Sequence, residues 1–310
     1  MGRAALLGCV AVGLAAAPAQ AQPRVKAAGE VTAIAFSADG QWLAVGHAAG
    51  VTLWSMKKRG EPVDLPPLGK PTQFVGFAGE QLAAADADVL VAWDLAAARE
   101  TFRLDLGQRR AAAAGGLRLL ADPHGPHLAV VALAASGEGT VEVFDLAAGR
   151  VVTAISRVRA DHQAAWSADG GWLLLDGAAW AWDDLRSWKP KNPGLATVGA
   201  GGKLLAYVDP AACADGITLV EPAARKVLRT IDPGDGGCPA DMWLVDGGRA
   251  LVWIGGPPGK RSDLWRWEAE RDRVHSIHRD VAHHPAAALS ADERFIALPD
   301  GAGVKFVSTR

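Results

Sequence analysis

The residues in this sequence that could take part in chemistry are mainly histidines and carboxylates. A neutral imidazole is the commonest metal ligand in proteins, and it also titrates near neutral pH. The candidates are His47, His162, His283 and His284, with Glu30 and Asp241 as acidic partners. No His-x-x-x-His, His-Glu-x-x-His or Cys-x-x-Cys spacing occurs in the sequence. We therefore expect loop histidines rather than a metal centre, and the sequence predicts no catalytic residue and no metal ligand.

A basic segment could recognise an anionic group. Gly255-Gly-Pro-Pro-Gly-Lys-Arg261 ends like a phosphate-binding loop. It lacks the Gly-x-x-x-x-Gly-Lys-Ser/Thr spacing, and no helical pattern follows it. We interpret it as a stiff basic loop that presents Lys260 and Arg261.

The N-terminus predicts export. Arg3 precedes an apolar run from Ala4 to Ala17, which is short for a transmembrane span, and Ala19-Gln20-Ala21 has the form of a cleavage site. We expect a signal peptide over residues 1–21 and one domain over 22–310, in the periplasm or secreted. A lipoprotein anchored at Cys9 is the alternative.

Export also bears on the cysteines. Cys9 is removed with the signal peptide, which leaves Cys213 and Cys238. An even pair in an oxidising compartment predicts a disulfide.

These residues must be positioned by a repeat. Val31–Gly46, His162–Leu175 and Pro285–Leu298 each contain an apolar strand, a Ser-Ala-Asp-Gly or Ser-Ala-Asp-Glu turn and a second apolar strand. Ser and Asp side chains cap such turns, and Gly accepts a positive φ. Each segment therefore predicts a β-hairpin.

A third strand follows each hairpin and often ends in an acidic residue. It recurs at a spacing of about 40 residues, which suits a four-stranded propeller blade. The occurrences are Leu53-Trp54-Ser55, Ala92-Trp93-Asp94, Val143-Phe144-Asp145, Ala181-Trp182-Asp183, Leu219-Val220-Glu221, Arg266-Trp267-Glu268 and Phe306-Val307-Ser308. The last unit lacks a fourth strand, and Pro23–Ala27 is an unassigned extended segment. If that segment pairs with the last unit, the ring is closed.

These repeats resemble the WD-repeat family and the related periplasmic propellers whose blades carry Ser-Pro-Asp-Gly turns. The resemblance covers nearly all of residues 22–310. It implies an all-β propeller of seven four-stranded blades, closed by the N-terminal strand. The alternative is a six-bladed ring with the third unit, around Ala111–Gly116, misread.

The resemblance also implies where the loops lie. The turns between second and third strands and the connections between blades should share one rim, which we call the first rim. The first rim receives the candidate binding residues His47, His162, Asp241, Lys260, Arg261, His283 and His284. It also receives Cys213 and Cys238, whose bond would stiffen it.

Composition limits the possible functions. The 310 residues carry 32 basic and 34 acidic side chains, so a nucleic-acid partner is not expected. The Gly-Lys-x-x-Trp repeat of quinone-cofactor propellers is absent, and no cofactor is expected. We expect a monomeric, non-enzymatic binding or scaffolding protein of the bacterial envelope or extracellular space, whose partner is a protein or a small ligand. The alternative is a propeller enzyme, such as a lactonase-like hydrolase or a lyase, with its site at the channel mouth.

Overall fold

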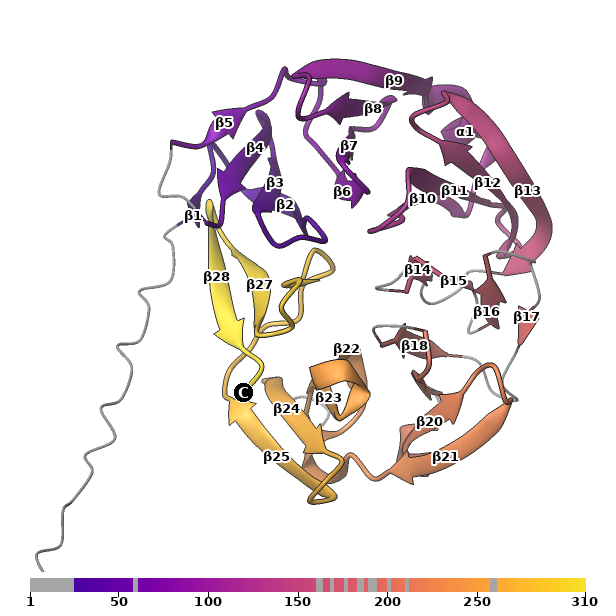
Figure 1. The fold of residues 1–310 in the computed structure, drawn as a ribbon, viewed down its shortest axis with the longest axis vertical. Coiled ribbons are helices and arrows are strands. Elements are labelled where there is room, and N and C mark those ends of the chain that lie inside the picture. The colour runs from indigo at the N-terminus through magenta and orange to yellow at the C-terminus, as the bar shows by residue number, and fades with distance from the viewer. Residues whose placement is uncertain are drawn as a thin grey trace, which may run out of the picture.

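The computed structural model describes residues 25–57, 61–159, 164–167, 170–175, 178–182, 187–188, 194–199, 202–209, 212–256 and 261–310. Seven four-stranded antiparallel sheets form a ring around a central axis (Figure 1). In each sheet the first strand lies nearest the axis and the fourth lies outermost. The predicted seven-bladed propeller is therefore confirmed.

The first three blades follow one another along the chain. Blade 1 contains β2 (Val31–Phe36), β3 (Trp42–His47), β4 (Gly50–Ser55) and β5 (Val63–Asp64). Blade 2 contains β6 (Phe74–Ala78), β7 (Gln81–Ala85), β8 (Val89–Asp94) and β9 (Arg99–Asp105). Blade 3 contains β10 (Gly116–Ala121), β11 (His127–Leu133), β12 (Glu138–Asp145) and β13 (Arg150–Arg159). The third unit is thus a complete blade, and the six-bladed alternative is wrong. The connector before it contains the helix α1 (Gly107–Ala112).

The remaining blades complete the circle. Blade 4 contains β14 (Ala164–Trp166), β15 (Trp172–Leu175), β16 (Ala178–Ala181) and β17 (Ser187–Trp188). Blade 5 contains β18 (Leu195–Val198), β19 (Leu205–Val208), β20 (Ile217–Glu221) and β21 (Lys226–Ile231). Blade 6 contains β22 (Pro239–Val245), β23 (Ala250–Gly255), β24 (Asp263–Glu268) and β25 (Arg273–His278). Blade 7 contains β26 (Ala288–Leu289), β27 (Phe295–Asp300), β28 (Gly303–Ser308) and β1 (Val25–Lys26).

The Ser-Ala-Asp turns form as their side chains predict. In blade 1 the Ser37 hydroxyl donates to Asp39 Oδ1 at 2.6 Å and accepts the backbone N–H of Trp42 at 2.9 Å. Blade 7 repeats this arrangement through Ser290, whose hydroxyl donates to Asp292 at 2.7 Å. The side chains thus bind the turn directly, which explains why the turn residues recur in sequence.

The acidic residue that ends several third strands has a structural partner. Directly opposite it, at the start of the fourth strand, lies a basic residue. The pairs are Asp94 with Arg99, Asp145 with Arg150, Glu221 with Lys226 and Glu268 with Arg273. Opposite charges at facing positions stabilise an antiparallel pair by about 0.2–1 kcal/mol. Asp94 and Asp145 also bind the turn that follows, because Oδ1 of Asp94 accepts the backbone N–H of Ala97 and Oδ1 of Asp145 accepts that of Ala147, both at 2.9 Å.

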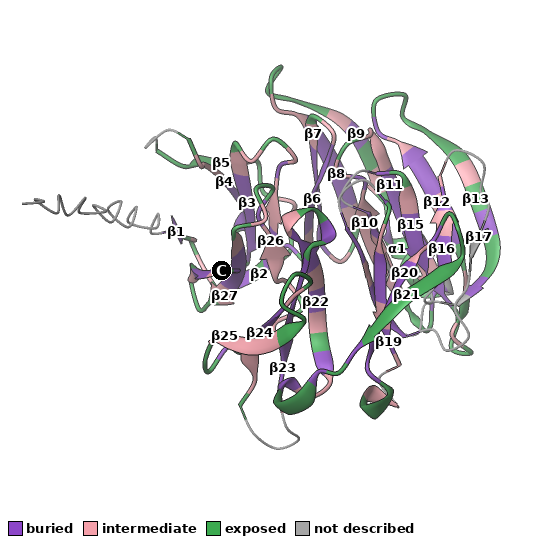
Figure 2. Ribbon diagram, turned by 60° about the horizontal axis from the view of Figure 1, so that its bottom comes forward, coloured by how far each residue is buried: buried purple, intermediate pink, exposed green. Residues whose placement is uncertain are grey.

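Burial decreases from the middle strands to the outer ones. Every residue of β23 is buried, whereas most of β21 is exposed (Figure 2). In the described part of the chain, the exposed large apolar side chains all lie on outermost strands; they are Val63, Val151, Val152, Val227 and Leu228. The core therefore lies between neighbouring blades. No described helix is long and apolar enough to cross a membrane.

The N-terminal strand closes the ring. β1 pairs with β28, with Val25 opposite Val304, and Val25 is only 3% exposed. The backbone N–H of Ala27 continues the pairing by donating to the carbonyl of Ala302 at 2.8 Å. The predicted closure is confirmed for Val25–Lys26, whereas Pro23 lies outside the described residues.

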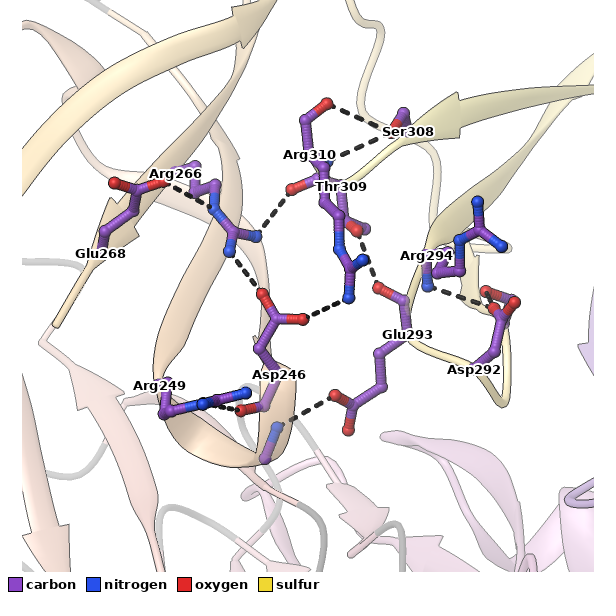
Figure 3. A network of polar contacts seen from close by, with 12 residues as sticks. Asp246, Arg249, Arg266, Glu268, Asp292, Glu293, Arg294, Ser308, Thr309 and Arg310 are labelled. Atoms are coloured by element: carbon purple, nitrogen blue, oxygen red, sulfur yellow. Dashed lines mark hydrogen bonds and ion pairs between the residues drawn. The ribbon is translucent and has the colours of Figure 1, made fainter. Parts of the chain in front are cut away.

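A polar cluster joins the end of the chain to blade 6 (Figure 3). Asp246, in the first turn of that blade, binds Arg266 of β24 and Arg310. Arg266 also donates to the carbonyl of Thr309 at 2.8 Å. Its side chain is nearly buried, so the cluster holds blades 6 and 7 together.

Candidate binding rim and central cavity

Strand registers define two rims. In blade 6, Pro239 pairs with Gly255, which brings the connection before β22 and the β23–β24 turn to one end of the sheet. Ala250 pairs with Glu268 at the opposite end, where the other two turns lie. The first end is the first rim predicted from the sequence, and we call the opposite end the second rim.

A cavity of about 1240 Å³ occupies the centre of the ring. Its wall includes Phe36, Arg118, Trp166, Thr197, Asp241, Trp243, His283 and Leu289, which come from six of the seven blades. Most of the lining is apolar, and the charged groups are few and separated. Such a wall suits a partner or ligand with an apolar body and a small number of polar groups.

The structure brings two of the predicted rim residues into this cavity. Asp241 lies near the start of β22, and His283 lies in the connection between blades 6 and 7. Asp241 Oδ1 accepts the backbone N–H of Met242 at 3.0 Å. Burial lowers the pKa of His283, and repulsion from His284 lowers it further. A neutral His283 can either donate or accept a hydrogen bond at the cavity mouth.

His284 and Arg261 lie beside these residues on the first rim. The Nδ1 atom of His284 accepts the backbone N–H of Ala286 at 3.1 Å, which orients the ring. Arg261 lies 3.5 Å from Asp280, and its side chain is 82% exposed. An ion pair as exposed as this contributes little to stability, so Arg261 is accessible to a partner. His162 and Lys260 lie outside the described residues.

The structure places His47 differently. It is 3% exposed, and its Nε2 lies 2.9 Å from the hydroxyl of Thr52, which donates to Asp64 at 2.6 Å. Its Nδ1 accepts the backbone N–H of Ala49 at 3.2 Å. Burial lowers the pKa of His47, and the charge of Asp64 partly opposes this effect. His47 therefore belongs to a buried network within blade 1 and does not line the cavity described above.

The predicted disulfide is present. Cys213 and Cys238 are bonded, with their Cα atoms 5.3 Å apart. Cys213 begins the short 3-10 helix η1 (Cys213–Asp215), between the second and third strands of blade 5. Cys238 lies in the connection to blade 6. The bond therefore joins two segments of the first rim, as the sequence predicted.

A polar group between blades 3 and 4 was not predicted from the sequence. Asp122, in the first turn of blade 3, is 2% exposed and binds His127 Nδ1 at 3.1 Å. The His127 ring lies 5.0 Å from that of Trp182 and 6.5 Å from that of Trp166. Carboxylate and aromatic rings together fix this imidazole, so the group joins blades 3 and 4. No group of three or more His, Cys, Asp or Glu residues suitable for a metal ion occurs in the described ranges.

Comparisons with known proteins identify the fold alone. No family model matches the sequence, and no curated protein matches it. The fold is similar to that of a chain in a solved structure described as "Crystal Structure of Mitotic Checkpoint Complex". The TM-score is 0.62 at 16% identity, covering 98% of this chain and 99% of that one. Because one fold carries many functions, identity this low does not transfer an activity.

Proposed function

We propose that the protein is a non-enzymatic binding or scaffolding propeller of the bacterial envelope or extracellular space, and that its partner docks on the first rim over the central cavity. One observation carries this proposal: Asp241 of blade 6 and His283 of the connection to blade 7 share the wall of one large cavity. Residues on loops held by a rigid scaffold are favoured for binding. The similar fold in a structure described as a protein complex agrees with a protein partner.

The location rests on the sequence. The apolar run ending at Ala19-Gln20-Ala21 supports cleavage before Gln22 and export. Sequencing the N-terminus of the protein purified from its host tests this step. A chain that begins at Gln22 supports it, and a lipid-modified Cys9 contradicts it.

Site-specific photo-crosslinking tests the docking rim. A photoreactive amino acid replaces Arg261 or His284 on the first rim, and Arg294 on the second rim serves as the control. We expect crosslinks to one defined partner from the first two positions, competed by unlabelled protein, and none from Arg294. Equal crosslinking from both rims, or crosslinking from Arg294 alone, would contradict the assignment.

The shared position of Asp241 and His283 also favours a second candidate, a hydrolase or lyase acting at the cavity mouth. A carboxylate and a neutral imidazole are groups that transfer protons in such reactions. Turnover of lactone or ester substrates by the purified protein, lost in both Asp241→Asn and His283→Ala, would favour the enzyme over the scaffold.

A further inference from the structure

The segment that carries Asp241 into the cavity wall begins with a proline and a register shift. Pro239 opens β22 and has no N–H to donate to the ladder. The register between β22 and β23 shifts between Pro239 and Asp241, which is a β-bulge. The ladder therefore holds this end of the strand weakly, although Pro239, Ala240 and Asp241 all line the cavity.

Close backbone packing partly compensates for this weak ladder. Gly236 lies in the short 3-10 helix η2 (Gly234–Gly236) and contacts Trp253, which is fully buried. A Cβ on Gly236 would lie 2.8 Å from the Trp253 ring, and one on Gly237 would lie 2.4 Å from the carbonyl oxygen of Gly256. Gly237 also has a φ of 56°. Only glycine fits at these two positions, so the connection lies flat on blade 6, where the buried Pro233 and a hydrogen bond from Trp253 Nε1 to the Gly236 carbonyl at 3.4 Å hold it.

The disulfide adds a covalent anchor directly before β22. Cys238 immediately precedes Pro239, and its bond to Cys213 ties the start of β22 to blade 5. We propose that this bond is a redox-sensitive strut that sets the position of Pro239–Asp241 at the cavity mouth. Its reduction loosens this side of the first rim and weakens docking there; the effect on docking rests on the function proposed above.

The chemical step balances with an external dithiol. Two electrons pass from the dithiol to the sulfur–sulfur bond of Cys213–Cys238, which breaks. Each cysteine sulfur takes up one proton, and the dithiol becomes a disulfide. We expect the ring to stay folded after reduction, with only the β22–β23 pairing opening more often.

Hydrogen exchange tests the strut without any ligand. The mature protein is compared before and after reduction by dithiothreitol, together with the double variant Cys213→Ser/Cys238→Ser. We expect amides of residues 240–245 to exchange at least about tenfold faster in the reduced protein and in the variant, with the strands of blade 2 unchanged. Unchanged protection in β22 would overturn the proposal. Equal acceleration in all blades would also overturn it, because the bond would then act on global stability.

Two glycine variants that keep the disulfide separate the effect of backbone packing on β22 from the effect of the redox state. Gly237→Ala keeps both cysteines but adds a methyl group against Gly256. We expect the same faster exchange in β22 with the disulfide intact, whereas Gly234→Ala, where no atom lies within 4 Å of the added Cβ, leaves β22 protected. Equal protection in these two variants would contradict a role for the Gly237 packing and would mean that the disulfide alone holds this end of β22.

Crosslinking from Arg261 in both redox states then tests the docking effect. A lower yield after reduction supports it, and an equal yield contradicts it. If neither state crosslinks to a partner, the proposed function fails, while the exchange result still decides the strut.

Discussion

Asp246 and Arg310 form an ion pair, with 2.7 Å between Oδ1 and Nη2, that joins the first turn of blade 6 to the end of the chain in blade 7 (Figure 3). The other carboxylate oxygen of Asp246 binds Arg266, whose side chain is only 10% exposed. Hydrogen bonding from Arg266, followed by that from Arg310, lowers the pKa of Asp246 against the opposing effect of burial. One carboxylate therefore pairs with two guanidinium groups at the junction between the two blades.

Removing that carboxylate should destabilise the propeller. Asp246→Asn leaves the nearly buried Arg266 without its main counter-charge, and asparagine tolerates the positive φ of 54° at this position. Because Arg266 keeps Glu268 and the Thr309 carbonyl, we expect a loss of about 3 kcal/mol, the lower end for a broken buried pair. Urea unfolding measures this loss of unfolding free energy. The control is Arg310→Ala, whose side chain is 60% exposed, with an expected loss of about 0–1 kcal/mol. Equal losses in the two variants would contradict the central role of Asp246.

The stability that the Asp246 carboxylate contributes should depend on pH in the acid range. Because the pKa of Asp246 is lowered in the folded protein, its contribution is complete above the ordinary aspartate pKa of about 3.9. It is lost as the pH falls through the lower value of the folded state. The difference in unfolding free energy between the wild type and Asp246→Asn should therefore narrow below about pH 4.

The N-terminal strand should be essential although it is short. Val25 is 3% exposed and covers the apolar surface of blade 7, whereas Lys26 points to solvent. We expect Val25→Asp to lose at least about 2 kcal/mol, the order of the burial energy of one valine side chain. Lys26→Asp should change stability by less than about 0.5 kcal/mol. Urea unfolding and size-exclusion chromatography measure both, with aggregation of Val25→Asp as a second sign. Identical unfolding of the two variants would mean that this strand does not close the ring.

The fold was predictable because its signals are local. A Ser37–Asp39 turn binds its own backbone, so the same residues recur wherever the same hairpin is needed. The first turn of blade 3 was not recognised as a member of the repeat, because Asp122 stands where the Ser-Ala-Asp turns have serine. The backbone N–H of Asp122 donates to the carbonyl of His127 at 2.9 Å, just as that of Ser37 donates to Trp42 at 3.0 Å. The span of five residues is conserved between the two turns while the residue types differ, so comparing spans would have found this turn.

The site was less predictable because it depends on contacts between blades. Asp241 and His283 line one cavity because blades 6 and 7 pack side by side, which no local pattern encodes. His47 lies at the predicted end of its strand, but its exposure depends on Thr52 and Asp64, which face it from the next two strands. A sequence pattern can place a residue near a rim, while packing decides whether its side chain reaches solvent.

Acidification should weaken blade 1 through His47. Burial lowers the pKa of His47 in the folded protein, so the unfolded chain takes up a proton first. The contribution of His47 to the unfolding free energy should be complete above about pH 6.5. It should decline as the pH falls below this value, because protonated Nδ1 can no longer accept the Ala49 N–H. Urea midpoints between pH 8 and pH 5.5 measure the decline, which should be smaller in His47→Gln. His283 has a lowered pKa as well, so His283→Gln is needed as the comparison. If the decline is unchanged in His47→Gln, other groups cause the loss of stability at low pH.

A pair of glycines can test the packing between blades 3 and 4. Gly170 and Gly149 both have a positive φ, 69° and 65° respectively, so alanine at either position carries a similar backbone cost of about 1 kcal/mol. Their surroundings differ. A Cβ on Gly170 would lie 2.3 Å from Oδ1 of the buried Asp122, whereas nothing lies within 4 Å of a Cβ on Gly149. Asp122 cannot move away without losing its bond to His127.

We therefore expect Gly170→Ala to cost about 1–3 kcal/mol more than Gly149→Ala, the range for added volume at a tightly packed site. Urea unfolding of the two variants gives the difference directly, because the backbone contribution cancels. Fluorescence of Trp166 and Trp182, whose rings lie 5.0 Å apart beside His127, should change only in Gly170→Ala. Equal stability of the two variants would show that the Asp122 carboxylate is not held tightly between these blades.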